Sequence, residues 1–420
     1  MLGLIVGLSL ATEAIAHEPK QSQADLAIIG AKIYPSPDAS PIEDGIVLMR
    51  AGRISRVGSR SAITVPGGMR VINAQGATLV AGFWNSHVHM MTPDLLGADK
   101  AKAEVLQHAL ETMLTRWGFT TVFDLASSTD NTLTLRNRVE SGEVAGPKIL
   151  TVGDPFYPKD GTPTYVRDYL KAHGAPNEEV SSPEEAAARA RRQLVRGTDG
   201  VKIFAGAVVG GKIGVLPMRV DIARAVVAEG HRYGKPAFAH PGSLAGLNVA
   251  IDSGVDVVAH TTAMDGGDKG GWSPELIARM RARNMAVIPT LTLLEVEAKK
   301  FGESPELLAK AIQATTSEVH DYSAAGGQIL FGTDVGYTDA FDTTEEYRLM
   351  AIVLDWRQIL ASLTTAPAKR FGLAAHKGKV MRGMDADLVL LYSDPAHDPT
   401  AFARVRDTIR AGRVIWGADR

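Results

Sequence analysis

The hydrophobic positions of this chain follow two different periods. Near both ends, apolar and polar residues alternate in short runs separated by glycine turns, as in "GIVLMRAGRISRVG" and "DADLVLLYSD". Alternation with a period of two predicts strands with one buried face. An Ala-Gly-Arg sequence separates apolar runs at residues 51–53 and again at 411–413, which fits a hairpin turn. We therefore expect residues 25–80 and 377–420 to form one small composite β-sandwich.

Between these ends, short apolar runs alternate with amphipathic segments of helical length. The predicted strands are residues 78–89, 120–125, 148–152, 200–204, 236–240, 255–260, 286–290 and 329–334. The helices expected between them include residues 101–117, 183–196, 220–233, 274–284 and 305–325. Strand–helix alternation repeated eight times predicts a parallel (β/α)8 TIM barrel, here over residues 81–376.

The first sixteen residues differ from this pattern. Residues 2–10 (LGLIVGLSL) are an apolar run too short to span a bilayer, and residues 14–16 (AIA) have the small-x-small form of a cleavage site. Residues 1–16 thus predict a signal peptide and a periplasmic or secreted protein. If this segment is not a functional signal, the protein is cytoplasmic.

Composition narrows the classes of partner. The 420 residues carry 45 Lys and Arg against 47 Asp and Glu, a net charge of −2 that favours neither nucleic acid nor an anionic membrane as partner. Cysteine is absent, so a metal site must use histidine, carboxylate or a modified side chain. We expect a small-molecule substrate and a homo-oligomer.

Polar side chains recur where the predicted strands end. His87 and His89 are two residues apart on one strand and so share a face. The other strand-end residues are Lys202, His240, His260 and Asp334. A barrel brings its strand ends to one mouth, where imidazoles and a carboxylate suit zinc.

Each of these residues also has an ordinary structural interpretation. A strand-end histidine is often a hydrogen-bonded core residue, and an aspartate often caps a helix. Lys202 could pair with a carboxylate or act as a Schiff-base lysine. The coincidence of polar residues at five strand ends favours a shared metal site over separate structural roles.

The order HxH, Lys, His, His, Asp on strands one, four, five, six and eight resembles the amidohydrolase superfamily. So do the strings "AGFWNSHVH", "DGVKIF", "KPAFAH", "GVDVVAHT" and "LFGTD", and the C-terminal "TTAPAKRFGL" with "GKVMRGMDADLVLL". The resemblance covers nearly all of residues 25–420. Within the superfamily, the spacing looks like the prolidase-like and ochratoxin-hydrolysing branch.

The resemblance implies a site for two divalent metal ions, most simply zinc, although manganese, iron or cobalt would also suit these ligands. His87 and His89 would bind one ion together with Asp334, and His240 and His260 would bind the other. Carbon dioxide would convert Lys202 into a carbamate that bridges both. A metal-bridging hydroxide would then attack a carbonyl carbon, with Asp334 as general base and afterwards as general acid.

The resemblance further implies an amide (C–N) substrate, such as a dipeptide or an N-acyl amino acid like ochratoxin A. The deaminases of the superfamily usually carry a glutamate shortly after the strand-five histidine, whereas here the sequence continues Pro241, Gly242, Ser243, Leu244. A deaminase, a lactonase or esterase, and a non-catalytic metal-binding barrel remain alternatives.

A substrate carboxylate needs cations or hydrogen-bond donors in the mouth loops. The candidates for this role are Tyr157, Tyr165, Arg167, Lys212, Arg219 and Tyr337. The candidates for an apolar wall are Phe156, Val208, Val209 and Leu291.

Overall fold

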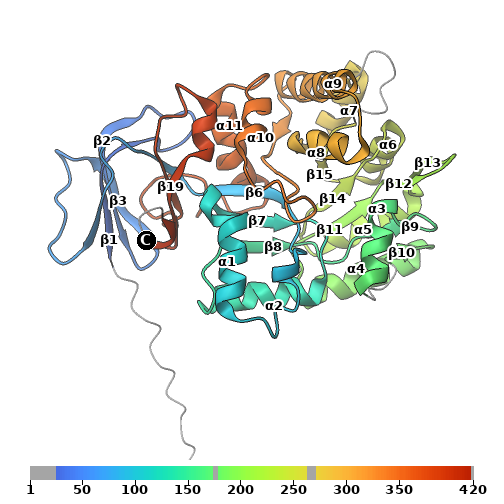
Figure 1. Cartoon of the computed structure of the whole chain (residues 1–420), viewed down its shortest axis with the longest axis horizontal. Coiled ribbons are helices and arrows are strands. Elements are labelled where there is room, and N and C mark those ends of the chain that lie inside the picture. The colour runs from blue at the N-terminus through green and yellow to red at the C-terminus, as the bar shows by residue number, and fades with distance from the viewer. Residues whose placement is uncertain (1–24, 174–177, 263–270, 418–420) are drawn as a thin grey trace, which may run out of the picture.

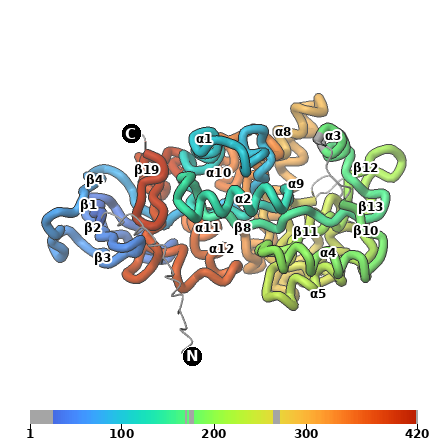
Figure 2. Tube along the Cα trace, turned by 90° about the horizontal axis from the view of Figure 1, so that it is seen from below, coloured from blue at the N-terminus to red at the C-terminus, as the bar shows by residue number. Residues whose placement is uncertain are grey.

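The structure is a computed structural model that describes residues 25–173, 178–262 and 271–417. Two parts lie side by side in Figures 1 and 2: a β-sheet part built from both ends of the chain, and a larger α/β part. The predicted signal peptide, residues 1–16, lies outside the described residues.

The terminal strands form one mixed sheet of eight strands, in the order β20-β19-β18-β5-β1-β2-β3 with β4 paired to β1. They are β1 (Leu26–Ile33), β2 (Ile42–Arg50), β3 (Arg53–Ser59), β4 (Arg70–Asn73), β5 (Thr78–Ala81), β18 (Leu388–Leu391), β19 (Val405–Arg410) and β20 (Arg413–Gly417). The two ends of the chain therefore do share one β-structure. Hydrogen bonds connect all eight strands.

One strand boundary was wrong. The sequence predicted a single barrel strand over residues 78–89, but β5 pairs with β18 and β1 in the terminal sheet. The barrel strand begins only at Phe83. The reason is packing: Leu79 and Ala81 of β5 join the core of the terminal sheet, while Phe83 joins the core of the α/β part.

The α/β part contains a three-stranded and a five-stranded parallel sheet, each paired in chain order. The first has β6 (Phe83–Val88), β7 (Phe119–Asp124) and β8 (Lys148–Thr151), and the second has β11 (Val201–Phe204), β14 (Ala237–His240), β15 (Val257–Ala259), β16 (Ala286–Ile288) and β17 (Gln328–Ile329). Backbone hydrogen bonds join the two sheets at both edges, from Phe156 to Lys202 (2.9 Å) and from Ser86 to Phe331 (2.8 Å). These eight strands occupy the positions predicted for the barrel.

Helices follow most of these strands and cover the outside of the sheets (Figure 1). They are α1 (Ala103–Met113), α2 (Thr129–Glu140), α3 (Thr164–His173), α4 (Pro183–Arg196), α5 (Val220–Arg232), α6 (Leu244–Ser253), α7 (Pro274–Ala282), α8 (Thr292–Phe301), α9 (Pro305–Ala324), α10 (Thr344–Met350), α11 (Trp356–Leu363) and α12 (Thr365–Arg370). A Ser-Pro pair begins α4, α7 and α9. In each, the serine hydroxyl accepts a hydrogen bond from the backbone N–H of the third helical residue. None of the helices within the described ranges is both long and apolar enough to cross a bilayer.

The apolar interior of the barrel lies directly below the site. Phe238 of β14 is buried inside the strands, against Phe123 and beneath Phe371 of the chain after α12. His240 is two residues further along the same strand and so points to the same side. The alternation of β14 thus places a hydrophobic floor and a polar ligand on one face.

Candidate metal centre

Three ligand-type side chains meet at the carboxyl ends of the first and last barrel strands. His87 lies in β6, His89 directly follows it, and Asp334 follows β17. Asp334 Oδ1 is 3.0 Å from His87 Nε2 and 2.8 Å from His89 Nε2, and all three residues are almost completely buried. Their ligand atoms lie within 4.8 Å of one another, which is a spacing that one metal ion can bridge.

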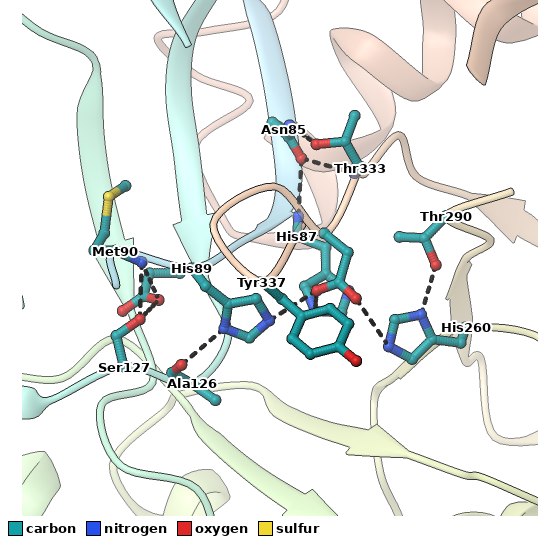
Figure 3. Close-up of polar contacts among 12 residues, drawn as sticks. Asn85, His87, His89, Met90, Ala126, Ser127, His260, Thr290, Thr333 and Tyr337 are labelled. Atoms are coloured by element: carbon teal, nitrogen blue, oxygen red, sulfur yellow. Dashed lines mark hydrogen bonds and ion pairs between the residues drawn. The ribbon is translucent and has the colours of Figure 1, made fainter. Parts of the chain in front are cut away.

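The protein fixes which nitrogen of His89 faces this point. The Nδ1 atom is 2.7 Å from the carbonyl oxygen of Ala126 (Figure 3). A carbonyl can only accept, so Nδ1 carries a proton and Nε2 is the nitrogen that faces the Asp334 carboxylate. Burial lowers the pKa of His89, but the hydrogen bond and the charge of Asp334 outweigh burial and raise it, so a positive charge is favoured between these two atoms, as a proton or as a metal ion.

His260 is oriented in the same way by a hydroxyl group. Its Nδ1 atom is 2.5 Å from Thr290 Oγ1, which in turn donates to the carbonyl of Pro289 at 2.7 Å. The hydroxyl has one hydrogen, so it accepts from His260 Nδ1 and leaves Nε2 free. That Nε2 lies 3.8 Å from the second carboxylate oxygen of Asp334.

Two further candidate ligands lie on neighbouring strands, Lys202 on β11 and His240 at the end of β14. The His240 ring lies 5.0 Å from the His260 ring and stacks on Phe204 at 4.8 Å. Lys202 is 2% exposed, and no ion pair to it occurs among the described residues. Lys202, His240 and His260 line the same cavity as His87, His89 and Asp334.

Burial sets the protonation of these groups. Desolvation lowers the pKa of His87 to about 4 and that of His240 to about 3, and it lowers the pKa of His260 as well. Desolvation also lowers the pKa of Lys202 to about 8. Neutral imidazoles are the form that binds metal ions.

The hydrogen bonding of the buried nitrogen and oxygen atoms in this site fits a bound metal ion. Among the described residues, the buried His240 Nε2 has no hydrogen-bond partner, and the contacts of the buried Asp334 Oδ1 are with His87 Nε2 and His89 Nε2. Buried polar atoms without a partner are costly and uncommon in folded proteins. Atoms of this kind aimed at one point are accounted for by a bound cation.

The backbone is also strained here. His260, Thr290 and Asp334 have φ angles of 78°, 49° and 61°, in the left-handed region that side chains other than glycine disfavour. Such strain typically occurs where a site demands a particular side-chain direction. These three residues all lie at the carboxyl ends of barrel strands.

Supporting residues that the sequence analysis missed lie directly behind the ligands. Buried Asp124 ends β7 and accepts hydrogen bonds from Ser127 Oγ (2.5 Å), Thr151 Oγ1 (2.7 Å) and the backbone N–H of Met90. It thereby fixes the chain next to His89. Thr290 ends a predicted strand and Asp124 lies one residue before the end of another, so their positions were an available signal.

A cavity of about 880 Å³ opens from this centre. Tyr157, Tyr165 and Tyr337 line it, as does Val208. The Tyr165 and Tyr337 rings are 5.4 Å apart, and the Tyr337 hydroxyl donates to Glu297 at 2.9 Å. Figure 3 shows the Tyr337 ring beside the histidines.

The cationic candidates for substrate binding lie elsewhere. Lys212 is exposed at the tip of the hairpin formed by β12 (Gly206–Gly210) and β13 (Gly214–Pro217). Arg219 is 65% exposed and pairs with Asp221, and exposed Arg167 donates to the carbonyl of Thr162. Phe156, Val209 and Leu291 are likewise not among the residues that line the cavity.

Comparison with known proteins decides the family. The amidohydrolase family matches residues 78–415, which is most of the chain. The chain belongs to the amidohydrolase family. This amidohydrolase is accordingly a metal-dependent hydrolase, with a metal site at His87, His89 and Asp334. No curated protein matches the chain.

Three solved structures with the same fold have names that state a function. A protein from Bifidobacterium longum described as a prolidase is 26% identical, with a TM-score of 0.77 over 95% of this chain and 97% of its own. A Xaa-Pro dipeptidase with bound methionine is 22% identical, with a TM-score of 0.77 over 93% and 99%. The A. niger ochratoxinase is 18% identical, with a TM-score of 0.76 over 94% and 96%.

Proposed function

We propose that this amidohydrolase cleaves the carbon–nitrogen bond of a small-molecule amide with two divalent metal ions. The observation that carries the proposal is the convergence of six ligand-type side chains, from five separate strands, on one cavity, with His87, His89 and Asp334 close enough to share one ion. Fold alone would not support this conclusion, because the same barrel hosts many functions.

The residues divide into two groups of ligands. His87, His89 and Asp334 would hold one ion, and His240 and His260 the other, with Lys202 between them as a carbamate. The lowered pKa of Lys202 supports this modification, since only the neutral amine adds to carbon dioxide, releasing one proton as the new C–N bond forms. Bound zinc ions would acidify a coordinated water to a pKa of about 7 and polarise the substrate carbonyl.

Asp334 is the residue placed to move the proton. Burial raises its pKa, but His87 and His89 outweigh burial and hold the pKa well below the usual range. The carboxylate is therefore ionised and can accept a proton from the attacking water. It would then give this proton to the leaving nitrogen, which makes a neutral amine.

Two classes of substrate share this bond. The first class is dipeptides and N-acyl amino acids, ochratoxin A included. The sequence resemblance supports this class, as does the similarity to the prolidase, the dipeptidase and the ochratoxinase. Amides without a carboxylate are the other class. Deaminase, lactonase and esterase activity and a purely metal-binding role are separate outcomes of the same experiment.

The test uses zinc-reconstituted protein with bicarbonate and a mixed pool of dipeptides, N-acyl amino acids, neutral amides, lactones and aminated heterocycles. Mass spectrometry follows every component. We expect a chelator-sensitive loss of an amide with both fragments appearing. Conversion of a heterocycle to its oxo form, or cleavage of lactones alone, would contradict amide hydrolysis.

An Asp334→Asn variant separates catalysis from metal binding. We expect turnover to fall by at least about a thousandfold while metal remains bound, because the amide keeps an oxygen ligand but cannot carry the proton. The matched control is Asp44→Asn, at an exposed aspartate of the terminal sheet. Unchanged turnover in Asp334→Asn would rule out this mechanism.

A further inference from the structure

The geometry points to a specific substrate class for the proposed amide hydrolysis: an uncharged amide that carries a large apolar group, with no carboxylate next to the scissile bond. This inference rests on the proposed function and adds what the substrate is. The charges and the apolar surface of the cavity support this substrate class.

The cavity is acidic away from the metal centre. Besides Asp334, the cavity lining contains the carboxylates Asp154, Glu178, Glu297 and Glu303. Among the lining residues that the structure describes, the only Lys or Arg is Lys202, at the metal centre. Away from the metal centre, a substrate carboxylate would therefore meet negative charge without a described Lys or Arg of the lining to pair with.

Two cations outside the described lining pair with carboxylates of the cavity. Arg189 is 2.6 Å from Glu178 and packs over the Phe156 ring, with 14% of its side chain exposed. Lys300 is 3.7 Å from Glu297 and 3.2 Å from the Tyr337 hydroxyl. Both are already paired with a carboxylate of the lining, so neither offers free positive charge to a substrate.

Helices α8 and α9 give the cavity an apolar surface. In α8, Leu294, Ala298 and Phe301 are spaced four and three residues apart, so they form one stripe, and all three line the cavity. Leu307 and Leu308 of α9 continue this surface. No residue of α8 is buried, and Phe301 remains 64% exposed. An apolar helix face that opens into a catalytic cavity, rather than into a core, is suited to an apolar part of the substrate.

The tyrosines fit an uncharged substrate as well. Burial raises the pKa of Tyr157, Tyr165 and Tyr337 above the ordinary value. Their hydroxyls are therefore neutral and can form hydrogen bonds with an amide, while their rings extend the apolar wall. Their placement supports binding of a carbonyl or an N–H group without a charged partner.

Three matched amides test charge and size separately. N-benzoyl-L-phenylalaninol is large and uncharged, N-benzoyl-L-phenylalanine adds the carboxylate, and N-acetyl-L-alaninol lacks the apolar groups. Dissociation constants are measured by calorimetry on the zinc-loaded Asp334→Asn variant, and cleavage is measured on the wild type. We expect the large uncharged amide to bind at least about tenfold more tightly than either of the others.

Variants locate the effect in the cavity. Phe301→Ala should weaken binding of the large uncharged amide about threefold to tenfold, because apolar contact area is lost. Ile352→Ala, at another exposed apolar residue that does not line the cavity, should leave it unchanged.

A second variant tests the charge argument. Glu297→Gln frees Lys300 from its carboxylate, so binding of N-benzoyl-L-phenylalanine should improve about fivefold relative to the alcohol. The control is Glu43→Gln, which removes a glutamate 3.6 Å from Lys32 on the terminal sheet. An unchanged ratio in Glu297→Gln would overturn the charge argument.

The outcomes distinguish this inference from the function on which it rests. Tighter binding of the carboxylate compound, or equal binding of all three, would overturn the inference even if amides are cleaved. The predicted order of binding without cleavage of any amide would support the inference and contradict amide hydrolysis. Absence of binding by all three compounds would overturn the inference.

Discussion

His260 is oriented by a hydroxyl group that has only one hydrogen to give. Because Thr290 gives that hydrogen to Pro289, it must accept from His260 Nδ1, and Nε2 is left for a metal ion. Groups that orient a metal-binding histidine typically contribute about tenfold to a hundredfold to metal affinity.

Replacing this hydroxyl should therefore weaken metal binding. We expect Thr290→Ala to raise the zinc dissociation constant by about tenfold or more. The measurement is competition with a chromophoric chelator. Thr408→Ala is the matched control, because this buried threonine also loses one hydrogen bond, to the carbonyl of Thr115, but lies in the terminal sheet. Equal zinc affinity in both variants would contradict the orienting role.

At this scale the sequence pointed to the candidate ligands but not to the residues that support them. The six candidates could be selected because each is a chemically distinctive residue at a strand end. The carbonyl of Ala126 could not, since every residue has one. Lys212 and Arg219 were chosen for charge alone, and their direction depends on a hairpin and a helix start that no local pattern specifies.

Gly336 shows how tightly the segment after β17 packs against the metal ligands. A Cβ atom there would lie 1.8 Å from the carbonyl oxygen of His89, and the φ angle is 97°. The neighbouring Val335 carbonyl accepts the His89 N–H at 2.8 Å. The position of this segment thus depends on glycine.

Gly336→Ala should displace this segment and with it Asp334 and His89. We expect metal affinity to fall at least about tenfold. Gly76→Ala controls for backbone strain, because φ is 80° there but nothing lies within 4 Å of the added atom. Metal content by mass spectrometry checks both, and an unaffected Gly336→Ala protein would show that the segment can shift freely.

Glu346 holds the start of α8, the helix that lines the cavity. Its carboxylate accepts the backbone N–H groups of Leu291 and Thr292 at 2.9 and 2.7 Å. Burial raises the pKa of Glu346 from 4.5 to about 7. Between these values the folded state binds the proton and the unfolded state releases it, so this residue's contribution to stability falls as pH rises.

Glu346→Gln removes that titration. As the pH rises from 5 to 8, the melting temperature of the variant should therefore increase relative to that of the wild type. The corresponding change in the difference in free energy of unfolding is up to about 3 kcal/mol. Exposed Glu275→Gln should show no such trend. A difference that stays constant with pH would contradict the raised pKa.

The two parts of the molecule share one hydrophobic core. Val80, Val389 and Leu391 of the terminal sheet are buried in the same cluster as Phe83 and Phe119 of the barrel. Figure 2 shows the two parts in contact along this face. Shared burial of this kind predicts that they unfold together.

Calorimetry should accordingly show one unfolding transition. Leu391→Ala should destabilise the whole protein by about 2–5 kcal/mol and keep the transition single. Leu307→Ala, at a half-exposed leucine of the cavity rim, should cost far less. Two separate transitions, with only one shifted by Leu391→Ala, would contradict a shared core.

At this scale the alternation of strands and helices was enough to predict the strand order of the barrel. It could not predict how the terminal strands pair. β5 and β6 form one apolar run in the sequence, and only the partners of Leu79 and Phe83 show that they belong to different sheets. Pairing over several hundred residues leaves no mark on local periodicity.

The central claim is that this chain hydrolyses an amide with two metal ions. The most direct test titrates zinc into chelator-stripped protein with bicarbonate and follows cleavage of N-benzoyl-L-phenylalaninol by mass spectrometry. The account predicts benzoate and phenylalaninol in equal amounts, with activity saturating at two zinc ions per chain. Saturation at one ion would contradict the two-metal centre, and cleavage that does not depend on added metal would contradict the account as a whole.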